Sequence, residues 1–591
     1  MIDEKDLAVI GNRLALSVFG YLAGLALWGL TEGWAHAAMP PALYLALFTF
    51  LLVYALSVLA LTGPVGFARA LWGGAVLAAL STVLLSWAGQ RFDLPTDVLD
   101  DPVHLPVIAI FVMIALPFVS GELQQRGAWR NYEVLFDTAW TITVRYSVAF
   151  GFVGVFWLVA FLSDALLALV DITFIALILR TQWAVFALTG GMLGLGLTVV
   201  YELRETVSPY LLLRLLRLLV PVVLGVVALF LAAVPVRGLG NLFGEFSAAA
   251  TLMGTVIVAI TLISAALDRC NQNAVATRGL RSATRALALL LPLLGGLSVW
   301  AVWLRVAQYG WTPDRCLAAC VASILLIYSL GYGVMSVRHN WQAGVRQINL
   351  GLALLVILVG ALWMTPVLNP YSISANSQAS RFLATTSRVD QLPIWSLVHD
   401  WGRAGQVALA QLERAQDHPD HAKLAARIAL ARTEPNRFNF DNGLSTLAAP
   451  DRASQLAALM AVRPASGALT AQSFASLAPH VLEDWLEACK RVLPTGLAGC
   501  VLVKGAFSPG FAADAQGMVI YLSSDSRAQA RHVVFRNGQI IDTQQVFDPV
   551  ANRWPDLPAQ VVEQALQGDF DVRPSNVNAL KIGDWTLIPG H

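Results

Sequence analysis

Residues 14–366 are almost continuously apolar, and prolines, glycines and charged clusters divide them into eleven stretches. Each stretch is close to the ~20 residues that a helix needs to cross the hydrocarbon core of a bilayer. A helix also satisfies its own backbone hydrogen bonds in lipid, where water is absent. We therefore predict eleven transmembrane helices, at residues 14–30, 42–62, 69–88, 104–120, 145–163, 183–201, 210–234, 247–267, 285–304, 316–336 and 348–366.

The basic residues between these stretches are distributed unequally between the two sides of the predicted membrane. Residues 1–366 contain twenty Lys and Arg, of which fifteen fall on one side. The five on the other side are Arg91, Arg180, Arg237, Arg305 and Arg315. Cytoplasmic loops carry the excess of Lys and Arg, so we predict a cytoplasmic N-terminus. Because the number of spans is odd, the 225 residues after residue 366 are predicted to lie outside the cytoplasm.

The composition changes after residue 366. Residues 367–591 hold 39 charged side chains, 19 basic and 20 acidic, whereas the longer region before them holds 38. Neither half carries the basic excess of a nucleic-acid-binding protein, so we predict no nucleic-acid partner. The predicted fold class is an all-α polytopic membrane bundle of about 11 transmembrane helices, followed by a soluble α+β domain. The predicted domains are the bundle at 1–366, a linker at 367–393 and an extracytoplasmic domain at 394–591.

Within the C-terminal domain, helical periodicity comes first and short alternating runs come after it. Helices are predicted at residues 394–415, 420–432, 451–462, 471–493 and 558–568, and strands at 500–506, 518–523, 532–535, 539–547 and 585–588. Asn537-Gly538 separates two of these strands and favours a hairpin with a type I′ turn. The pattern predicts a small antiparallel sheet after a helical first half.

Some segments of the membrane region fit no span. Residues 129–143 have the spacing of an amphipathic helix lying at the lipid headgroups. Residues 166–179 are apolar but short. They form a surface-lying piece, a re-entrant piece or a further span, and a further span would invert the later topology.

Residues 14–30 resemble a signal-peptide core, but the acidic leader favours a retained first span. Gly190 and Gly194 form a G-x-x-x-G pattern, which we assign to close packing within the bundle.

The sequence contains few indications of a catalytic or ligand-binding site. Charged side chains avoid the middles of the predicted spans, where an ionisable group would indicate a functional site. The sequence has no phosphate-binding loop, zinc-protease helix or nucleophile elbow. We therefore predict no catalytic residue, no cofactor-binding residue and no metal ligand.

One loop between the ninth and tenth predicted spans carries an unusual arginine. Thr312 before Pro313 is typical of a helix start, and Arg315 falls in the first turn, where the helix dipole disfavours a cation. We expect Arg315 to pair elsewhere. The candidate partners are Glu245, the segment 369–378 or an anionic ligand.

The same loop, Arg305-Val-Ala-Gln-Tyr-Gly-Trp-Thr-Pro-Asp-Arg315, supports a family resemblance. Its Tyr309-Gly310 and Thr312-x-x-Arg315 resemble the Tyr-Gly-x-Thr-x-x-Arg loop of bacterial membrane proteins of domain-of-unknown-function family 4153. Three further features agree: the multi-span region, a later Asn369-Pro370 with Gln378 and Arg381, and a trailing soluble domain. The resemblance implies a multi-pass protein of the bacterial inner membrane and supplies no catalytic residues.

Two cysteines of the C-terminal domain are placed to form a disulfide. Cys489 ends a predicted helix and Cys500 opens a predicted strand, with a short turn-rich loop between them. An extracytoplasmic compartment is oxidising enough for a disulfide to persist. We predict that the two cysteines form a disulfide there.

Our leading functional hypothesis is a non-enzymatic inner-membrane protein that presents a periplasmic binding or interaction domain, with a role in the cell envelope. Its expected partners are the lipid bilayer and a periplasmic protein or envelope component. The alternative is a transporter or lipid-handling protein for a neutral or amphipathic substrate, because eleven spans exceed what anchoring needs. An intramembrane enzyme is a third hypothesis. A polar cavity within the membrane, lined by helices kinked at Pro117, Pro221 and Pro292, would favour the alternative.

Overall fold

The computed structural model describes residues 4–587 except 33–38, 171, 203–208, 238–247, 276, 385–387, 435, 442–448, 465–467, 494, 509–511, 525, 547–556, 573–579 and 583–584. The chain forms two compact units, Met1–His421 and Ala422–His591. The first unit includes the predicted linker at 367–393, because helices after the last span pack with the membrane region.

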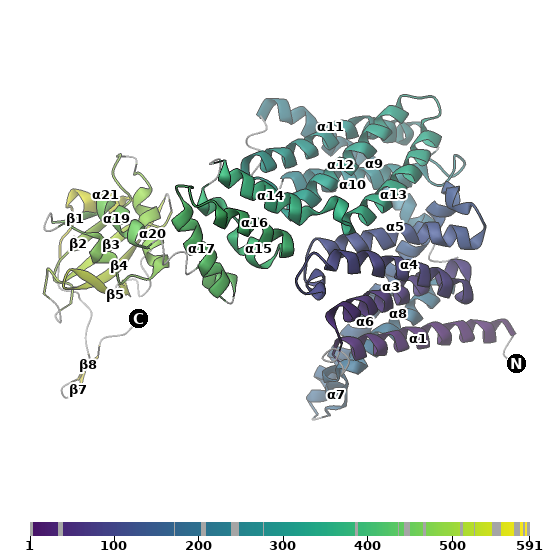
Figure 1. The fold of residues 1–591 in the computed structure, drawn as a ribbon, viewed down its shortest axis with the longest axis horizontal. Coiled ribbons are helices and arrows are strands. Elements are labelled where there is room, and N and C mark those ends of the chain that lie inside the picture. The colour runs from purple at the N-terminus through teal and green to yellow at the C-terminus, as the bar shows by residue number, and fades with distance from the viewer. Residues whose placement is uncertain are drawn as a thin grey trace. The chain divides into compact units, whose positions relative to one another are not determined.

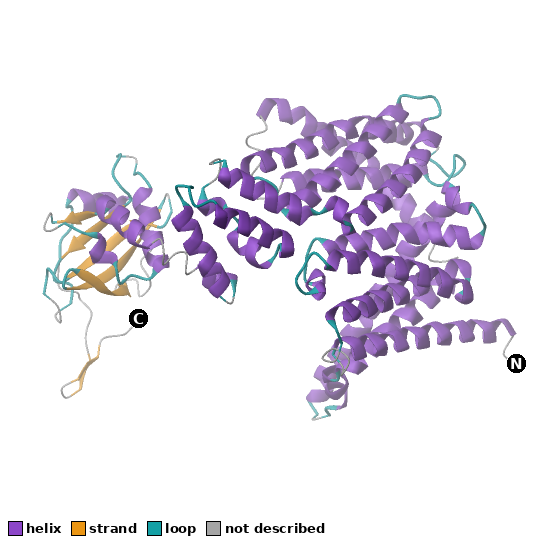
Figure 2. Ribbon diagram, in the orientation of Figure 1, coloured by secondary structure: helices purple, strands orange, loops and turns teal. Residues whose placement is uncertain are grey.

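The first unit is a bundle of helices (Figures 1 and 2). Its described residues contain eleven helices that are long and apolar enough to cross a membrane. They are α1 (Glu4–Thr31), α3 (Pro41–Val65), α4 (Phe67–Gly89), α5 (His104–Gln124), α6 (Tyr132–Ala168), α8 (Gln182–Glu202), α9 (Pro209–Arg237), α10 (Ala248–Leu267), α11 (Arg278–Tyr309), α12 (Pro313–Ser336) and α13 (Trp341–Met364). The prediction of a multi-pass membrane protein with eleven spans is confirmed.

Helix α6 corrects one prediction, and α7 excludes one of the three alternatives for residues 166–179, a further span. The predicted headgroup helix at 129–143 is mostly the first part of α6, which runs unbroken for 37 residues, about 55 Å. Its Phe136 and Ile142 are buried in the bundle. Arg145, which we placed at the start of a span, is therefore inside a long helix, where it is buried and donates to Leu197 O at 3.1 Å. Helix α7 (Phe174–Arg180) has seven residues, too few to cross a bilayer.

Helices α1 and α8 approach each other closely through glycines. A Cβ atom added to Gly190 or Gly194 would overlap the backbone of Gly20 or Leu16 in α1. Only residues without a side chain allow two helix backbones to come so near. The predicted role of the G-x-x-x-G pattern, packing within one chain, is what the structure shows.

The segment after α13 is helical, so the prediction of a linker at 367–393 was wrong in its structure. After the short 3₁₀ turn η5 (Pro366–Leu368) comes α14 (Pro370–Leu383), and then η6 (Val389–Gln391), α15 (Ile394–His399) and α16 (Gly402–Arg414). The Asn369 side chain accepts hydrogen bonds from the backbone N–H groups of Tyr371 and Ser372, which caps α14. Tyr371, Ala375 and Phe382 on one face of α14 are buried.

The second unit combines helices with the strands that Figure 2 shows in orange. The helices are α17 (His421–Thr433, beginning at the boundary), α19 (Ala449–Leu459), α20 (Pro479–Lys490) and α21 (Gln560–Gln567). The main sheet has the order β1 (Ala461–Arg463), β2 (Cys500–Lys504), β3 (Gln516–Leu522), β4 (Arg527–Arg536) and β5 (Gln539–Gln545), with β6 (Leu557–Pro558) also on β4. A separate hairpin joins β7 (Leu580–Ile582) and β8 (Trp585–Leu587).

The sheet is mixed, which corrects the antiparallel prediction. Strand β1 pairs with β2 in parallel, whereas β2, β3, β4 and β5 pair antiparallel. A parallel pair needs a crossover connection, and here the chain between β1 and β2 contains α20. The predicted hairpin is present: Arg536 pairs with Gln539, and Asn537 and Gly538 have φ of 52° and 79°, as a type I′ turn requires.

Cys489 at the end of α20 and Cys500 at the start of β2 are joined in a disulfide, with Cα atoms 4.8 Å apart. Both cysteines are buried in the core of the second unit, beside Trp485 and Tyr521. The bond therefore ties a helix to the sheet that it covers. The predicted pairing of these two cysteines is the one that the structure contains.

Candidate functional site: the exit junction

The residues after the last span are fixed to the bundle at two places. We call residues 365–383 the exit segment and its two sets of contacts the exit junction. One set, the loop anchor, lies where α11 ends and α12 begins. The other, the Arg91 anchor, lies where α4 and α13 end. Both sets consist mainly of side chains that donate hydrogen bonds to backbone carbonyls at helix C-termini.

The loop anchor begins with the open carbonyls of α11. The last four carbonyls of any helix have no partner within the helix. The Arg381 guanidinium donates to Ala307 O at 3.2 Å and to Gln308 O at 2.8 Å. The Gln378 amide donates to Tyr309 O at 3.0 Å and to Trp311 O at 2.9 Å. Two side chains of α14 thus cap the end of α11 and hold the exit segment to it.

Arg315 takes part in the same anchor from the other side of the loop. Thr312 caps α12 as predicted, accepting from the Arg315 backbone N–H at 3.3 Å. The Arg315 guanidinium folds back and donates to Gly310 O at 2.8 Å and Tyr309 O at 3.3 Å. It also lies 5.4 Å from the centre of the Tyr309 ring. The cation that is unfavourable at the start of α12 is therefore favourable at the end of α11.

The predicted partners of Arg315 have different outcomes in the structure. Glu245 lies outside the residues that the structure describes. The segment 369–378 does not receive the Arg315 guanidinium; instead its Gln378 binds the same loop from the other side. The residues that carry the family resemblance, Tyr309, Gly310, Thr312, Arg315, Gln378 and Arg381, therefore lie together.

Gly310 is required by its surroundings. Its φ of 75° lies in the left-handed region that favours glycine. A Cβ atom there would lie 2.8 Å from Arg381 Cδ and 2.9 Å from Gln378 Nε2. A side chain would therefore strain the turn and push away the two groups that cap α11.

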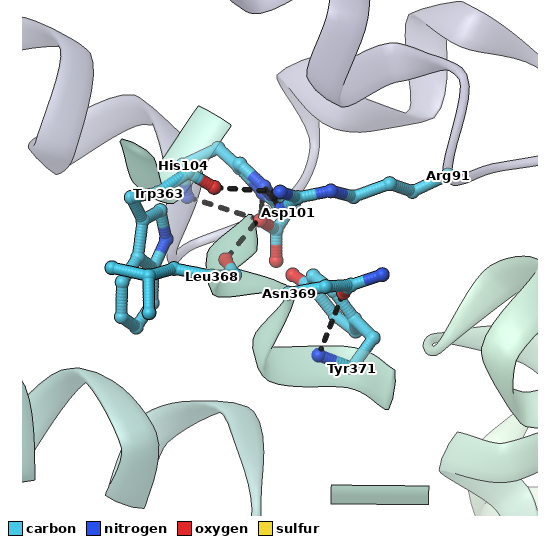
Figure 3. Close-up of polar contacts among 7 residues, drawn as sticks. All are labelled: Arg91, Asp101, His104, Trp363, Leu368, Asn369 and Tyr371. Carbon is cyan, nitrogen blue, oxygen red and sulfur yellow. Dashed lines mark hydrogen bonds and ion pairs between the residues drawn. The ribbon is translucent and has the colours of Figure 1, made fainter. Parts of the chain in front are cut away.

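The Arg91 anchor is built around a half-buried guanidinium (Figure 3). Arg91 Nη2 donates to Trp363 O and Thr365 O, both at 2.6 Å, and to Leu368 O at 3.5 Å. These carbonyls belong to the end of α13 and the start of the exit segment. Burial lowers the pKa of Arg91 to about 10, so the side chain stays charged at neutral pH.

A buried histidine orients Arg91. His104 Nε2 lies 2.8 Å from Arg91 Nη1, and His104 Nδ1 contacts the Asp101 carboxylate. Arginine can only donate, so Nε2 must accept and the proton of the neutral imidazole must be on Nδ1, facing Asp101. A chain from carboxylate through imidazole to guanidinium results. This chain fixes the direction in which Arg91 points.

Tyr371 closes the anchor from the exit segment. Its ring stacks on that of His104, with centroids 5.6 Å apart and planes 8° from parallel, and its edge meets Phe92. Burial raises the pKa of the Tyr371 hydroxyl, and the nearby negative charge of Asp101 raises it further. Burial also disfavours the charged form of Asp101, but hydrogen bonding from His104 outweighs this, and the pKa of Asp101 is lowered. At neutral pH Asp101 is charged and Tyr371 is neutral.

The Arg91 anchor was not predicted from the sequence. We counted Arg91 only as a charge that reports topology, His104 was only the first residue of a predicted span, and Asp101 was given no role. The available signal was Asp101-x-x-His104, in which the carboxylate accepts from the His104 backbone N–H at 3.0 Å. The carbonyls that Arg91 binds belong to residues of any type, so no motif marks them.

The side chains of the exit junction hold backbone segments in place, and its histidine is not placed to act on a substrate. His104 is fully buried, so a substrate has no access to its ring. Within the described ranges, no group of three or more His, Cys, Asp or Glu is arranged to hold a metal ion. Chemically, the arrangement supplies hydrogen-bond donors to the open carbonyls of α11 and α13.

A separate cavity lies inside the membrane region, with a volume of about 280 Å³. Side chains from α5, α6, α10 and α13 line it, including Pro117, whereas Pro221 and Pro292 do not. Most of its wall is apolar, but Tyr132, Ser264 and Asn349 bring polar atoms to it. Asn349 Nδ2 donates to the Tyr132 hydroxyl at 3.2 Å, and its Oδ1 accepts from Tyr332 at 2.5 Å. The pocket is thus amphipathic.

Comparisons of this chain with protein-family models, with curated proteins and with solved structures found no match. Functional inference therefore rests on the residues of the chain itself.

Proposed function

We propose that this multi-pass membrane protein is a non-enzymatic component of the bacterial inner membrane that holds its C-terminal domain in the periplasm, where the domain binds an envelope partner. The observation that supports it most is the exit junction. A passive anchor needs no contact between the bundle and the chain beyond its last span. Here Arg91, which follows α4, binds the end of α13 and the start of the exit segment. Gln378 and Arg381 of the exit segment bind the end of α11.

Orientation is argued from the distribution of basic residues, fifteen against five, which favours a cytoplasmic N-terminus. With eleven spans, the exit junction and the C-terminal domain are then on the periplasmic side. The disulfide between Cys489 and Cys500 fits an oxidising compartment. The gathering of the resemblance residues in one junction supports the further proposal that the chain is related to domain-of-unknown-function family 4153.

Labelling of single cysteines in intact spheroplasts tests this proposal. Lys423 in α17 and Arg278 at the start of α11 are both exposed. In Lys423→Cys, a membrane-impermeant maleimide should label the new thiol without lysis. In Arg278→Cys, labelling should need permeabilised cells, and the parent protein gives the background from its native cysteines. The reverse pattern would disprove the periplasmic placement of the domain.

A second candidate function is the binding of an amphipathic molecule, and the intramembrane cavity is the specific observation for it. At about 280 Å³ the cavity is just below the usual range for ligand sites, ~300–1,000 Å³, so it fits part of one acyl chain or a small amphiphile. The hydroxyls of Tyr132 and Ser264 and the amide of Asn349 would receive the polar end.

A photoreactive phospholipid with a diazirine in its acyl chain tests this second function. Ala139 lines the cavity, whereas Ala165, on the same helix α6, is exposed and does not. Ala139→Trp should fill the cavity and abolish crosslinks to the residues that line it. Ala165→Trp, the matched control, should leave them unchanged. Equal crosslinking in all three proteins would mean that the cavity does not hold the lipid.

A further inference from the structure

A second hollow, away from the exit junction, is lined mainly by basic side chains. It lies between the first turns of α11 and the connection from α12 to α13, and its volume is about 470 Å³. We call it the basic hollow. Its lining residues are Arg281, Ser282, Arg285, Val337, Arg338, His339 and Trp341.

The charges in the basic hollow are not compensated by its own lining. Three arginines and one histidine contribute to it, and none of its lining residues is acidic. Arg281 and Arg285 are four residues apart on α11, and like charges at that spacing repel. All four basic side chains are solvent-exposed. Positive charge is thus gathered in a concave, accessible place.

The guanidinium of Arg285 is held in place while most of its donors stay available. Arg285 Nε donates to Ser336 O at 2.6 Å, which satisfies the end of α12. Arginine has five N–H donors, so within the described part of the chain four terminal N–H groups of Arg285 have no protein acceptor. A fixed guanidinium with open donors is well suited to the oxygens of a phosphate.

Two helix N-termini add to the positive potential. Helix α11 begins at Arg278 and α13 begins at Trp341, and neither has an acidic residue in its first turn. The positive end of a helix dipole is stabilised by a nearby anion. At α13 the preceding Asn340 makes no capping hydrogen bond through its side chain. Side chains and backbone therefore favour the same kind of ligand.

The position of the hollow indicates where the anion comes from. The spans α11, α12 and α13 begin or end beside it, so it lies at the level of the lipid headgroups. Val337, 68% exposed, gives its lining apolar surface next to the cations, whereas Trp341, 3% exposed, lines it from the buried core. Basic pockets between spans bind acidic headgroups.

We propose that the basic hollow binds the phosphate of an anionic phospholipid headgroup from the adjacent leaflet. Arg281, Arg285 and Arg338 surround the phosphate, and the acyl chains lie along the bundle surface. This site lies apart from the exit junction and from the intramembrane cavity. It depends on neither the proposed function nor the proposed orientation, since both leaflets contain phospholipid.

Native mass spectrometry of the full-length protein in detergent tests the proposal with three probes: a phosphatidylglycerol, a phosphatidylcholine with the same chains, and inorganic phosphate. The parent should bind phosphatidylglycerol more tightly than phosphatidylcholine. Arg281→Gln/Arg338→Gln should weaken phosphatidylglycerol binding by roughly tenfold or more, because charge-assisted hydrogen bonds are lost. Arg281→Lys/Arg338→Lys should keep part of the affinity, because charge remains but the planar fork is lost.

The matched control removes two charges outside the hollow, in Arg126→Gln/Arg130→Gln. Both control residues are exposed, and neither lines the hollow. The control should bind phosphatidylglycerol like the parent. An equal loss in both double variants would show a general surface-charge effect and overturn the site. Binding of inorganic phosphate without a preference for phosphatidylglycerol would overturn the lipid assignment, and binding of none of the probes would overturn the proposal entirely.

Discussion

At the exit junction, Arg91 and Arg381 donate to backbone carbonyls, whereas in the basic hollow Arg281 and Arg338 line an open space. The helix ends explain the difference. The exit junction is built on the C-termini of α11 and α13, whose open carbonyls are acceptors. The basic hollow also contains one helix C-terminus, that of α12, which Arg285 caps through Ser336 O. It further includes the N-termini of α11 and α13, which already carry positive potential. The same residue type therefore stabilises the fold in one place and leaves binding capacity in the other.

The largest expected effect is that of Arg91→Ala. It would leave carbonyls at the end of α13 and the buried His104 Nε2 without their donor. Each unsatisfied buried group costs about 1–3 kcal/mol, so we expect a loss of roughly 3 kcal/mol in the free energy of unfolding. Arg91→Lys should recover only part of it. Denaturant unfolding of the purified protein measures both, and a stability equal to that of the parent would refute the Arg91 anchor.

Gly310→Ala should have the next largest effect. The residue has φ of 75°, and the added Cβ would meet Arg381 and Gln378. Backbone strain of this kind costs on the order of 1–3 kcal/mol. The matched control is Gly254→Ala, within α10, where a Cβ has open space. We expect faster proteolysis of the exit segment in Gly310→Ala only; the same increase in both variants would mean that the loop anchor is not specific.

Arg315→Ala should cost less, about 1 kcal/mol, because two carbonyl contacts of a partly exposed side chain are lost. Insertion into the membrane should be unchanged, and Arg315→Lys should rescue in part. Proteolysis of the exit segment in membranes measures the effect. Cleavage of the Ala variant at the parental rate would show that Arg315 contributes nothing to the junction.

The smallest effect, of opposite sign, is expected in the basic hollow. Arg281→Gln removes a like charge four residues from Arg285, so it should leave the unfolding free energy unchanged or raise it by a few tenths of a kcal/mol. A thermal unfolding midpoint at or slightly above that of the parent would agree. A clear drop would mean that Arg281 has a structural partner and that the contrast with the exit junction is false.

The sequence predicted the spans well because length and hydrophobicity alone decide whether a helix can cross a bilayer. It missed α14 because, between the large residues Tyr371 and Phe382, the buried face consists of small and polar residues, namely Ser374, Ala375, Gln378 and Ala379. In the sequence alone, such a face resembles a turn-rich linker. Gln378 is buried because its donors meet carbonyls of α11, and this pairing is visible only in three dimensions.

For the candidate site, the sequence identified the loop but not its partners. The positive end of the helix dipole disfavours an arginine in the first turn, and this local feature identified Arg315 from the sequence. Arg91 conflicts with nothing in its own neighbourhood, because it comes after α4 at the end where a cation is favourable. Its acceptors are main-chain atoms more than 270 residues away, Trp363 O and Thr365 O. Such contacts carry no sequence signature.

The central claim is that the exit segment is part of the bundle. Amide hydrogen exchange of the full-length protein in lipid nanodiscs tests it most directly, because exchange reports local opening. We expect the amides of α14 to exchange nearly as slowly as those of α13, and to exchange faster by tenfold or more in Arg91→Ala/Gln378→Ala while α13 stays protected beyond its last turn. Rapid exchange of α14 in the parent, or no change in the double variant, would contradict the account.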